Sequence, residues 1–136
     1  MELNIRMLQD SDWDTLVSWW DGWKEWKAPP RDMLPDNGKG GFMVENESGP
    51  IVAGFLYTTN SKTAWVEWIV SDPAYKNKDR KNAIELLING AENVAKNQGF
   101  KYMFSIGKNK HLIETHEKLG YHVDVSPSYE IIKKIN

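Results

Sequence analysis

One carboxylate stands in the middle of an otherwise apolar segment. Glu67 lies within Thr63–Ser71, whose β-branched and aromatic residues predict a strand. Because side chains alternate along a strand, we expect Glu67 to share a face with Trp65 and Ile69. The opposite face would then carry Val66, Trp68 and Val70. In this position Glu67 serves either as a general base or as a polar group on a solvated or hydrogen-bonded sheet face.

A run of cations follows this segment. Its sequence is Lys76-Asn77-Lys78-Asp79-Arg80-Lys81, and it leads into a predicted helix. Positive side chains at a helix start are unfavourable, whereas a bound phosphate is favoured there. The run therefore indicates either a phosphate site or a solvated loop and first helical turn.

The histidines predict no metal site. His111, His116 and His122 show neither HxH nor HxxxH spacing, and the chain has no cysteine. Disulfides, thiolate metal ligands and cysteine nucleophiles are thereby excluded. His116 suits either a proton donor near neutral pH or a half-buried helix residue.

The composition is that of an ordinary folded domain. The 136 residues are 40% apolar and 26% charged, and the net charge is -2. This charge gives no whole-protein attraction to nucleic acid or anionic membrane. The polar start does not resemble a signal peptide, and no apolar stretch approaches the roughly 18 residues of a membrane helix. We expect a single cytoplasmic domain over residues 1–136 that binds neither nucleic acid nor membrane.

The elements that must position these residues are helices and strands in the order β-α-(α)-β-β-β-α-β-α-β-β, in which the three consecutive strands form an antiparallel meander. Apolar periodicity predicts helices from about Trp13 to Trp23, over Asp79–Gln98 and from Asn109 to Leu119, with a short one over Arg31–Asp36. Strands are predicted over Leu3–Leu8, Phe42–Glu45, Ile51–Thr59, Thr63–Ser71, Tyr102–Ile106, His122–Val125 and Tyr129–Ile135. A helical crossover joins two of these strands, which requires parallel pairing and so predicts a mixed sheet.

Tryptophan is concentrated in and just after the first predicted helix. One face of that helix is expected to pack on the sheet and carries Trp13, Leu16, Trp20 and Trp23. Trp19 and Trp26 fall beside this face. For them, three interpretations stay open: core, the border of a binding cleft, or the surface of a homodimer or other partner.

The element order resembles that of the GNAT superfamily of acyl-CoA-dependent N-acyltransferases, over essentially the whole chain. Val66–Pro73 is similar to the family's fourth strand, and Pro73–Lys76 with the helix after it looks like the cofactor-binding loop and helix. Asn109–Tyr121, which reads NKHLIETHEKLGY, is similar to the family's late helix. The resemblance implies an α/β (α+β) fold with a mixed central sheet of about seven strands flanked by helices. A chain with so little beyond the minimal fold also suits a small phage or mobile-element protein.

The loop departs from the family pattern. The family reads Arg or Gln, two residues, Gly, one residue, then Gly or Ala, because bare backbone N–H groups must approach the pyrophosphate of coenzyme A. Here Lys76 takes the Arg or Gln position, but Asp79 and Lys81 stand where the small residues belong. An aspartate repels pyrophosphate, whereas the neighbouring cations attract it. His116 stands where the family often has a tyrosine that protonates the leaving thiolate.

The resemblance implies an N-acetyltransferase that uses acetyl-CoA as co-substrate and a small-molecule or peptide primary amine as acceptor. Glu67 would be the base and His116 the acid. The remaining implied contacts are with coenzyme A: backbone of Ile69, Val70 and Ser71 along the pantetheine, Lys76, Lys78, Asp79, Arg80 and Lys81 around the pyrophosphate, and Asn109 on the pantetheine arm. A plain helix cap explains Asn109 equally well. The damaged loop equally suits a GNAT-fold binding protein that has lost this chemistry.

Overall fold

The computed structural model describes residues 2–24, 26–124 and 126–136. The chain forms two compact units, residues 1–106 and residues 107–136. The first unit contains the β-sheet and two helices, and the second contains the helix α3 (Lys110–Lys118).

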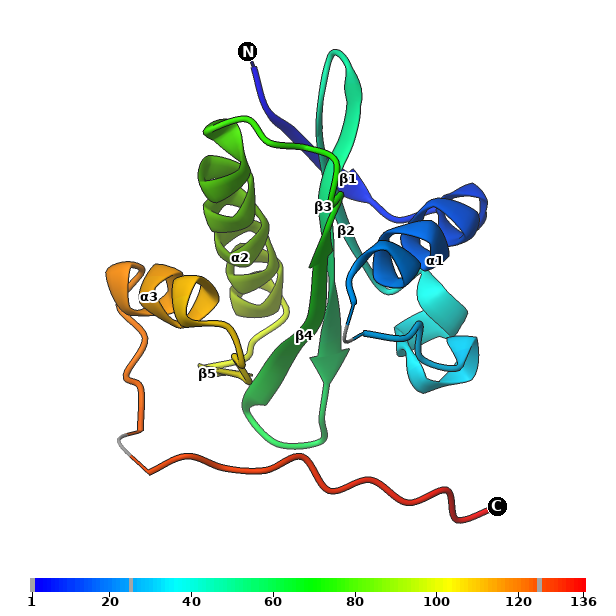
Figure 1. Cartoon of the computed structure of the whole chain (residues 1–136). Helices are drawn as coiled ribbons and strands as arrows, with labels where there is room; N and C mark the ends of the chain where they lie inside the picture. The colour runs from blue at the N-terminus through cyan, green and yellow to red at the C-terminus, as the bar shows by residue number, and fades with distance from the viewer. Residues whose placement is uncertain (1, 25, 125) are drawn as a thin grey trace. The chain divides into compact units, whose positions relative to one another are not determined.

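The sheet of the first unit is mixed, as predicted (Figure 1). Its strands lie in chain order and are β1 (Asn4–Met7), β2 (Gly41–Asn46), β3 (Gly49–Thr58), β4 (Thr63–Ser71) and β5 (Tyr102–Ser105). The first four pair antiparallel; short turns join β2 to β3 and β3 to β4, whereas the segment that contains α1 joins β1 to β2. The helix α2 (Asp79–Asn97) carries the chain from β4 to β5, and these two strands pair in parallel.

Two helices cover opposite faces of this sheet, as Figure 1 shows. The helix α1 (Trp13–Gly22) presents Leu16, Trp19 and Trp20 to one face, where they pack with Met43, Ala53, Phe55 and Val70. The helix α2 presents Ala83, Leu87, Ala91 and Ala95 to the other face, where they pack with Val44, Val52, Leu56 and Val66. The central strands β2, β3 and β4 are therefore largely buried on both faces and read as nearly continuous apolar runs, whereas the edge strands β1 and β5 are partly exposed.

The predicted short helix at Arg31–Asp36 takes a tighter form. The structure has two single turns of 3-10 helix, Arg31–Met33 and Pro35–Gly38. Asp36 and Asn37 adopt positive φ values of 48° and 50°, which are incompatible with a right-handed α-helix. These turns close the α1 side of the sheet, since Leu34 is only 3% exposed.

The prediction of about seven strands is wrong for the described residues, which form five. No strand occurs in the described part of 121–136, and Val125 lies outside the described residues. A strand exists only with a hydrogen-bonded neighbour, and apolar alternation alone does not supply one. The large apolar side chains of 126–136 are 64–93% exposed, namely Tyr129, Ile131, Ile132 and Ile135.

Candidate active site at the unpaired edge of β4

Strands β4 and β5 pair over only part of β4. Their register runs from Thr63 opposite Tyr102 to Val66 opposite Ser105 and ends there. Strand β4 continues to Ser71, held on its other side by β3. We call Glu67–Ser71 on the side away from β3 the unpaired edge. An acyl-CoA site of the predicted kind requires such an edge, because the pantetheine would run along it as an extra strand.

A β-bulge lies at the start of the unpaired edge. Phe55 is opposite Glu67 and Ala53 is opposite Val70, so Gly54 alone faces both Trp68 and Ile69. Trp68 has a φ of 58°, which is unusual for a residue with a side chain. A bulge leaves its extra residue without a ladder partner and bends the strand.

The bulge changes which side chains share a face, so the prediction from strict alternation is wrong beyond Glu67. Val66 and Ile69 pack on the α2 side of the sheet, whereas Trp68 and Val70 pack on the α1 side. Glu67 therefore does not share its face with Ile69. The inserted residue shifts the alternation by one, and no feature of the local sequence predicts this shift.

Glu67 lies on the α1 side, beside Tyr57. Its register partner Phe55 packs on that side, and Glu67 is half-buried. Burial, the largest cause, and the charge of Glu67 both raise the pKa of Tyr57, while a hydrogen bond with the Trp68 side chain lowers it. The Tyr57 hydroxyl donates to the Met33 carbonyl over 2.9 Å. Sequence reasoning missed Tyr57, because neither motif nor period marks it. It placed Trp68 on the face opposite Glu67, whereas both lie on the α1 side.

The backbone at the end of β4 presents polar groups to the unpaired edge. Asp72 N–H donates to the Ile51 carbonyl of β3 over 2.9 Å. Alternation in an antiparallel ladder then turns the backbone of Val70 towards β3 and that of Ser71, and by the same count Ile69, away from it. Of the three predicted pantetheine contacts, Ile69 and Ser71 thus have outward-facing backbone groups.

A tryptophan occupies part of this edge. The indole Nε1 of Trp23 donates to the Ser71 carbonyl over 2.9 Å. Trp23 follows the last residue of α1, Gly22, whose position is so close to Pro73 that a Cβ there would lie 2.6 Å from its Cγ. The predicted packing face of the helix therefore ends in a residue that contacts the candidate site.

Arg80 closes the same end of the edge. Its Nη2 donates to the Asp72 carbonyl over 2.7 Å, and its guanidinium carbon lies 5.6 Å from the centre of the Trp23 ring. The Arg80 Nε is buried without a hydrogen-bond partner among the described residues, and so is the Ser105 hydroxyl at the other end of the edge. Both ends of the unpaired edge thus carry a buried polar atom that a ligand could satisfy.

The rest of the predicted phosphate loop faces solvent. Lys76, Lys78 and Lys81 are exposed, and Asp79 is half-buried in the first turn of α2. The side chain of Asn77 accepts the Asp79 N–H over 3.1 Å. One of the N–H groups that would otherwise meet a phosphate is therefore already bonded.

The other two predicted site residues belong to the second unit. Asn109 caps α3, as its side chain accepts the His111 N–H over 2.8 Å. His116 is 5% exposed, and its Nδ1 lies 2.8 Å from the Leu112 carbonyl. That contact requires a proton on Nδ1, so Nε2 is the nitrogen left to exchange a proton. Nε2 is buried and has no partner among the described residues.

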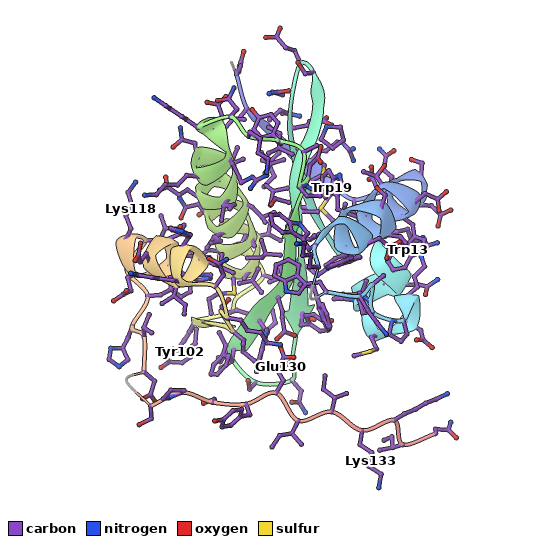
Figure 2. All side chains as sticks on the ribbon, viewed as in Figure 1. Trp13, Trp19, Tyr102, Lys118, Glu130 and Lys133 are labelled. Atoms are coloured by element: carbon purple, nitrogen blue, oxygen red, sulfur yellow. The ribbon has the colours of Figure 1, made fainter. Side chains whose placement is uncertain are left out.

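Most of the tryptophan cluster is core. Trp19 and Trp20 are 5% and 2% exposed, and Trp13 and Trp23 pack against the same cluster; Figure 2 labels Trp13 and Trp19 on α1. Trp26 is 37% exposed and contacts the Trp23 ring at 5.7 Å between centroids. Trp19 is thus part of the core, one of the three interpretations left open for it.

The described residues contain no group of three or more metal-ligating side chains. None of the helices within them has the length and apolarity to cross a membrane.

Known proteins resemble this chain in structure. No protein-family model matches the sequence, and neither does any curated protein. The ribosomal-protein-S18-alanine N-acetyltransferase of Escherichia coli matches with a TM-score of 0.68 at 15% identity, over 88% of this chain and 77% of its own. The chain has the GNAT fold.

Other GNAT structures cover the chain almost completely. A GCN5-related N-acetyltransferase from Ralstonia eutropha matches with a TM-score of 0.66 at 14% identity, over 96% of this chain and 99% of its own. An aminoglycoside 6'-N-acetyltransferase from Acinetobacter haemolyticus matches with a TM-score of 0.62 at 17% identity, over 98% and 99%. The fold resemblance inferred from the sequence is confirmed.

Proposed function

We propose that the protein is an N-acetyltransferase that moves an acetyl group from acetyl-CoA to a small-molecule or peptide primary amine. The observation that carries the proposal is the bulge of β4. It lies where the pairing with β5 has ended and next to Glu67. An unpaired strand edge, a backbone group without a ladder partner and a carboxylate are thus adjacent.

These groups suit direct transfer. Glu67 takes one proton from the ammonium group of the acceptor, and the freed nitrogen attacks the thioester carbonyl. The C–N bond forms and the C–S bond breaks. The thiolate of coenzyme A takes the second nitrogen proton, with His116 as the acid that passes it on. A backbone N–H left free by the bulge stabilises the oxyanion that forms on the way.

Coenzyme A would lie along the unpaired edge. The backbone of Ile69 and Ser71 would meet the pantetheine amides, and Asn109 is a further contact proposed for that arm. Near the pyrophosphate the exposed Lys76, Lys78 and Lys81 supply positive charge, alongside Arg80 and in opposition to Asp79. Binding requires the Trp23 indole to leave the Ser71 carbonyl, since the indole and the pantetheine would use the same carbonyl oxygen.

A binding protein without acetyl-CoA chemistry is the second candidate. It is favoured by the Trp23 bond to Ser71 and by the Asn77 side chain, which takes the Asp79 N–H at the start of α2. In such a protein the core of the fold is retained, while the polar groups of the cofactor edge form hydrogen bonds within the protein instead of with coenzyme A.

Release of free thiol from acetyl-CoA in the presence of primary amines separates the two candidates. We expect turnover with the intact protein and a loss of about 100-fold for Glu67→Gln, because general base catalysis contributes on that order. His116→Gln should lower turnover less. If no amine releases thiol above the rate without protein, the transferase proposal is rejected in favour of the binding protein.

A further inference from the structure

Tyr75 connects the end of β2 with the loop that leads into α2. Its hydroxyl accepts a hydrogen bond from the buried Asn46 side chain, whose Nδ2 lies 3.2 Å away. The Tyr75 ring packs against the core cluster on the α2 side of the sheet, and its backbone N–H donates to the Asp72 carbonyl over 3.1 Å. Asn46 is itself fixed, because its Oδ1 accepts the Ser48 N–H over 2.8 Å. The sheet therefore sets the position of the Tyr75 hydroxyl, whose own proton is left to donate.

Asp79 accepts that proton. A hydrogen bond joins the Tyr75 hydroxyl to the side chain of Asp79, which lies in the first turn of α2. Burial, the largest cause, and then the charge of Asp79 raise the pKa of Tyr75; the hydrogen bond to Asp79 raises it further, whereas the one from Asn46 lowers it. These opposite signs agree with a hydroxyl that receives a hydrogen bond from the amide and donates one to the carboxylate. We call Asn46, Tyr75 and Asp79 the loop cluster.

The loop cluster draws the Asp79 carboxylate towards β2. Within the sheet, β3 lies between β2 and β4, so Asn46 is two strands from β4 and on the side opposite the unpaired edge. Neighbouring strands are about 4.8 Å apart, which puts β2 about 10 Å from β4. A carboxylate bonded to the Tyr75 hydroxyl therefore points away from the edge along which coenzyme A would lie.

We propose that Tyr75 is a positioning residue for a diphosphate ligand: anchored by Asn46, it holds the Asp79 carboxylate on the β2 side and leaves the start of α2 open to the anion. The choice of ligand rests on the proposed function, whereas the arrangement of the loop cluster does not. An aspartate in the first turn stabilises a helix but repels a bound phosphate. The loop cluster resolves this conflict, because the carboxylate keeps its place in the first turn while it is bonded to a neutral hydroxyl away from the ligand. The chain can thus carry Asp79 where the GNAT pattern has a small residue.

The loop cluster is tested without a ligand. The intact protein with 13C-labelled tyrosine is titrated to high pH in an NMR experiment, and the Tyr75 ring signal is assigned by its loss in Tyr75→Phe. We expect Asp79→Asn to lower the pKa of Tyr75, because a negative charge that disfavours the phenolate is removed. Asn46→Ala should raise it, because a donor that favours the phenolate is removed. Glu47→Gln is the matched control, since it removes an exposed carboxylate beside Asn46 and should leave the pKa of Tyr75 nearly unchanged.

A double-mutant cycle tests the positioning role. Tyr75→Phe keeps the ring and removes the hydroxyl, which frees the Asp79 carboxylate to approach the anion. We expect about five-fold weaker binding of coenzyme A in calorimetric titration, the effect of one like charge a few ångströms away in water. In the Asp79→Asn background the same substitution should leave the affinity unchanged, because no charge remains to be held. A merely structural role of the hydroxyl would weaken binding equally in both backgrounds. Inorganic pyrophosphate at equal ionic strength is the second ligand of the cycle.

The proposal is rejected if Asp79→Asn leaves the pKa of Tyr75 unmoved, if Tyr75→Phe leaves both affinities unmoved, or if Tyr75→Phe weakens binding equally with and without the Asp79 carboxylate. Its failure and that of the proposed function are distinguishable. Pyrophosphate binding that follows the expected cycle, without coenzyme A binding or thiol release, would reject acetyl transfer and leave the positioning role standing. Thiol release together with equal losses in the two backgrounds would reject the positioning role alone. No binding of either ligand to the intact protein would reject both.

Discussion

Replacing Trp23 with phenylalanine tests whether the Trp23 indole competes with coenzyme A for the edge of β4. The substitution removes the Nε1–H that donates to the Ser71 carbonyl over 2.9 Å. It keeps a ring beneath the Arg80 guanidinium, which lies 5.6 Å from the centre of the Trp23 ring, and beside Trp26. The change therefore isolates one hydrogen bond.

The expected changes in stability and in coenzyme A affinity follow from the loss of that hydrogen bond. A net contribution of about 1 kcal/mol lowers the free energy of unfolding by that amount and the melting temperature by about 2–6 °C. In the proposed coenzyme A site the same interaction would oppose the ligand, because the ligand would have to displace the indole. Its loss should therefore tighten coenzyme A binding about five-fold, the affinity equivalent of 1 kcal/mol.

Calorimetric titration with coenzyme A and urea denaturation on the same preparations measure both quantities. Trp26→Phe is the control, since Trp26 contacts the Trp23 ring and is 37% exposed. It should change neither quantity by more than about 0.5 kcal/mol. If Trp23→Phe lowers stability while coenzyme A binds equally or more weakly, the indole does not compete with the ligand and the reasoning is refuted.

Three further changes test the surroundings of the site. Gly22→Ala places a Cβ 2.6 Å from Pro73 Cγ, so we expect about 1–3 kcal/mol lower stability in urea denaturation; a wild-type midpoint would contradict the close approach of α1 to the end of β4. Gly54→Ala brings a Cβ to 3.0 Å from Leu87 and 3.2 Å from Ile69, and it should cost about 1 kcal/mol and shift the Ile69 amide signal in NMR spectra; an unmoved signal would show that the bulge tolerates the methyl group. Arg6 holds the pKa of Asp12 below its ordinary 3.8 through two hydrogen bonds of 2.9 Å, so this pair stabilises the fold fully above pH 3.8 and less as the pH falls through the folded-state pKa. Asp12→Asn should be less stable than wild type at pH 7 by about 2 kcal/mol and lose less on acidification; parallel pH curves would contradict this contribution.

Elements governed by local signals were predictable from the sequence. The helix α2 was expected over Asp79–Gln98 and runs over Asp79–Asn97, because its apolar stripe is wide and Gly99, with a φ of 94°, ends it. Asn109 caps the next helix as predicted, since an asparagine oxygen bonds the free N–H groups of a first turn without help from distant residues.

Features set by distant residues were not predictable. The bulge of β4 depends on a single residue of β3, Gly54, facing two of β4, and alternation alone gives the wrong faces for Ile69, Trp68 and Val70. The Trp23 bond joins residues 48 positions apart. Helical spacing correctly assigned Trp23 to a packing face, but it carries no information about which carbonyl the indole meets.

The prediction of two C-terminal strands was wrong for a related reason. Apolar alternation over Tyr129–Ile135 satisfies the local pattern of a strand, yet pairing depends on a neighbour that the pattern does not specify. For the candidate site, the sequence located Glu67 and the Lys76–Lys81 run. It correctly placed Trp65 on the face of Glu67, but it did not locate Tyr57, because which residues meet across strands depends on the register of the sheet.

Titration of the intact protein with acetyl-CoA and with coenzyme A tests the central claim, that the unpaired edge of β4 and the start of α2 form a coenzyme A site. We predict saturable heat at micromolar ligand and a melting temperature that rises with ligand concentration, as binding to the folded state alone requires. No heat and no change in melting temperature at millimolar ligand would contradict the claim.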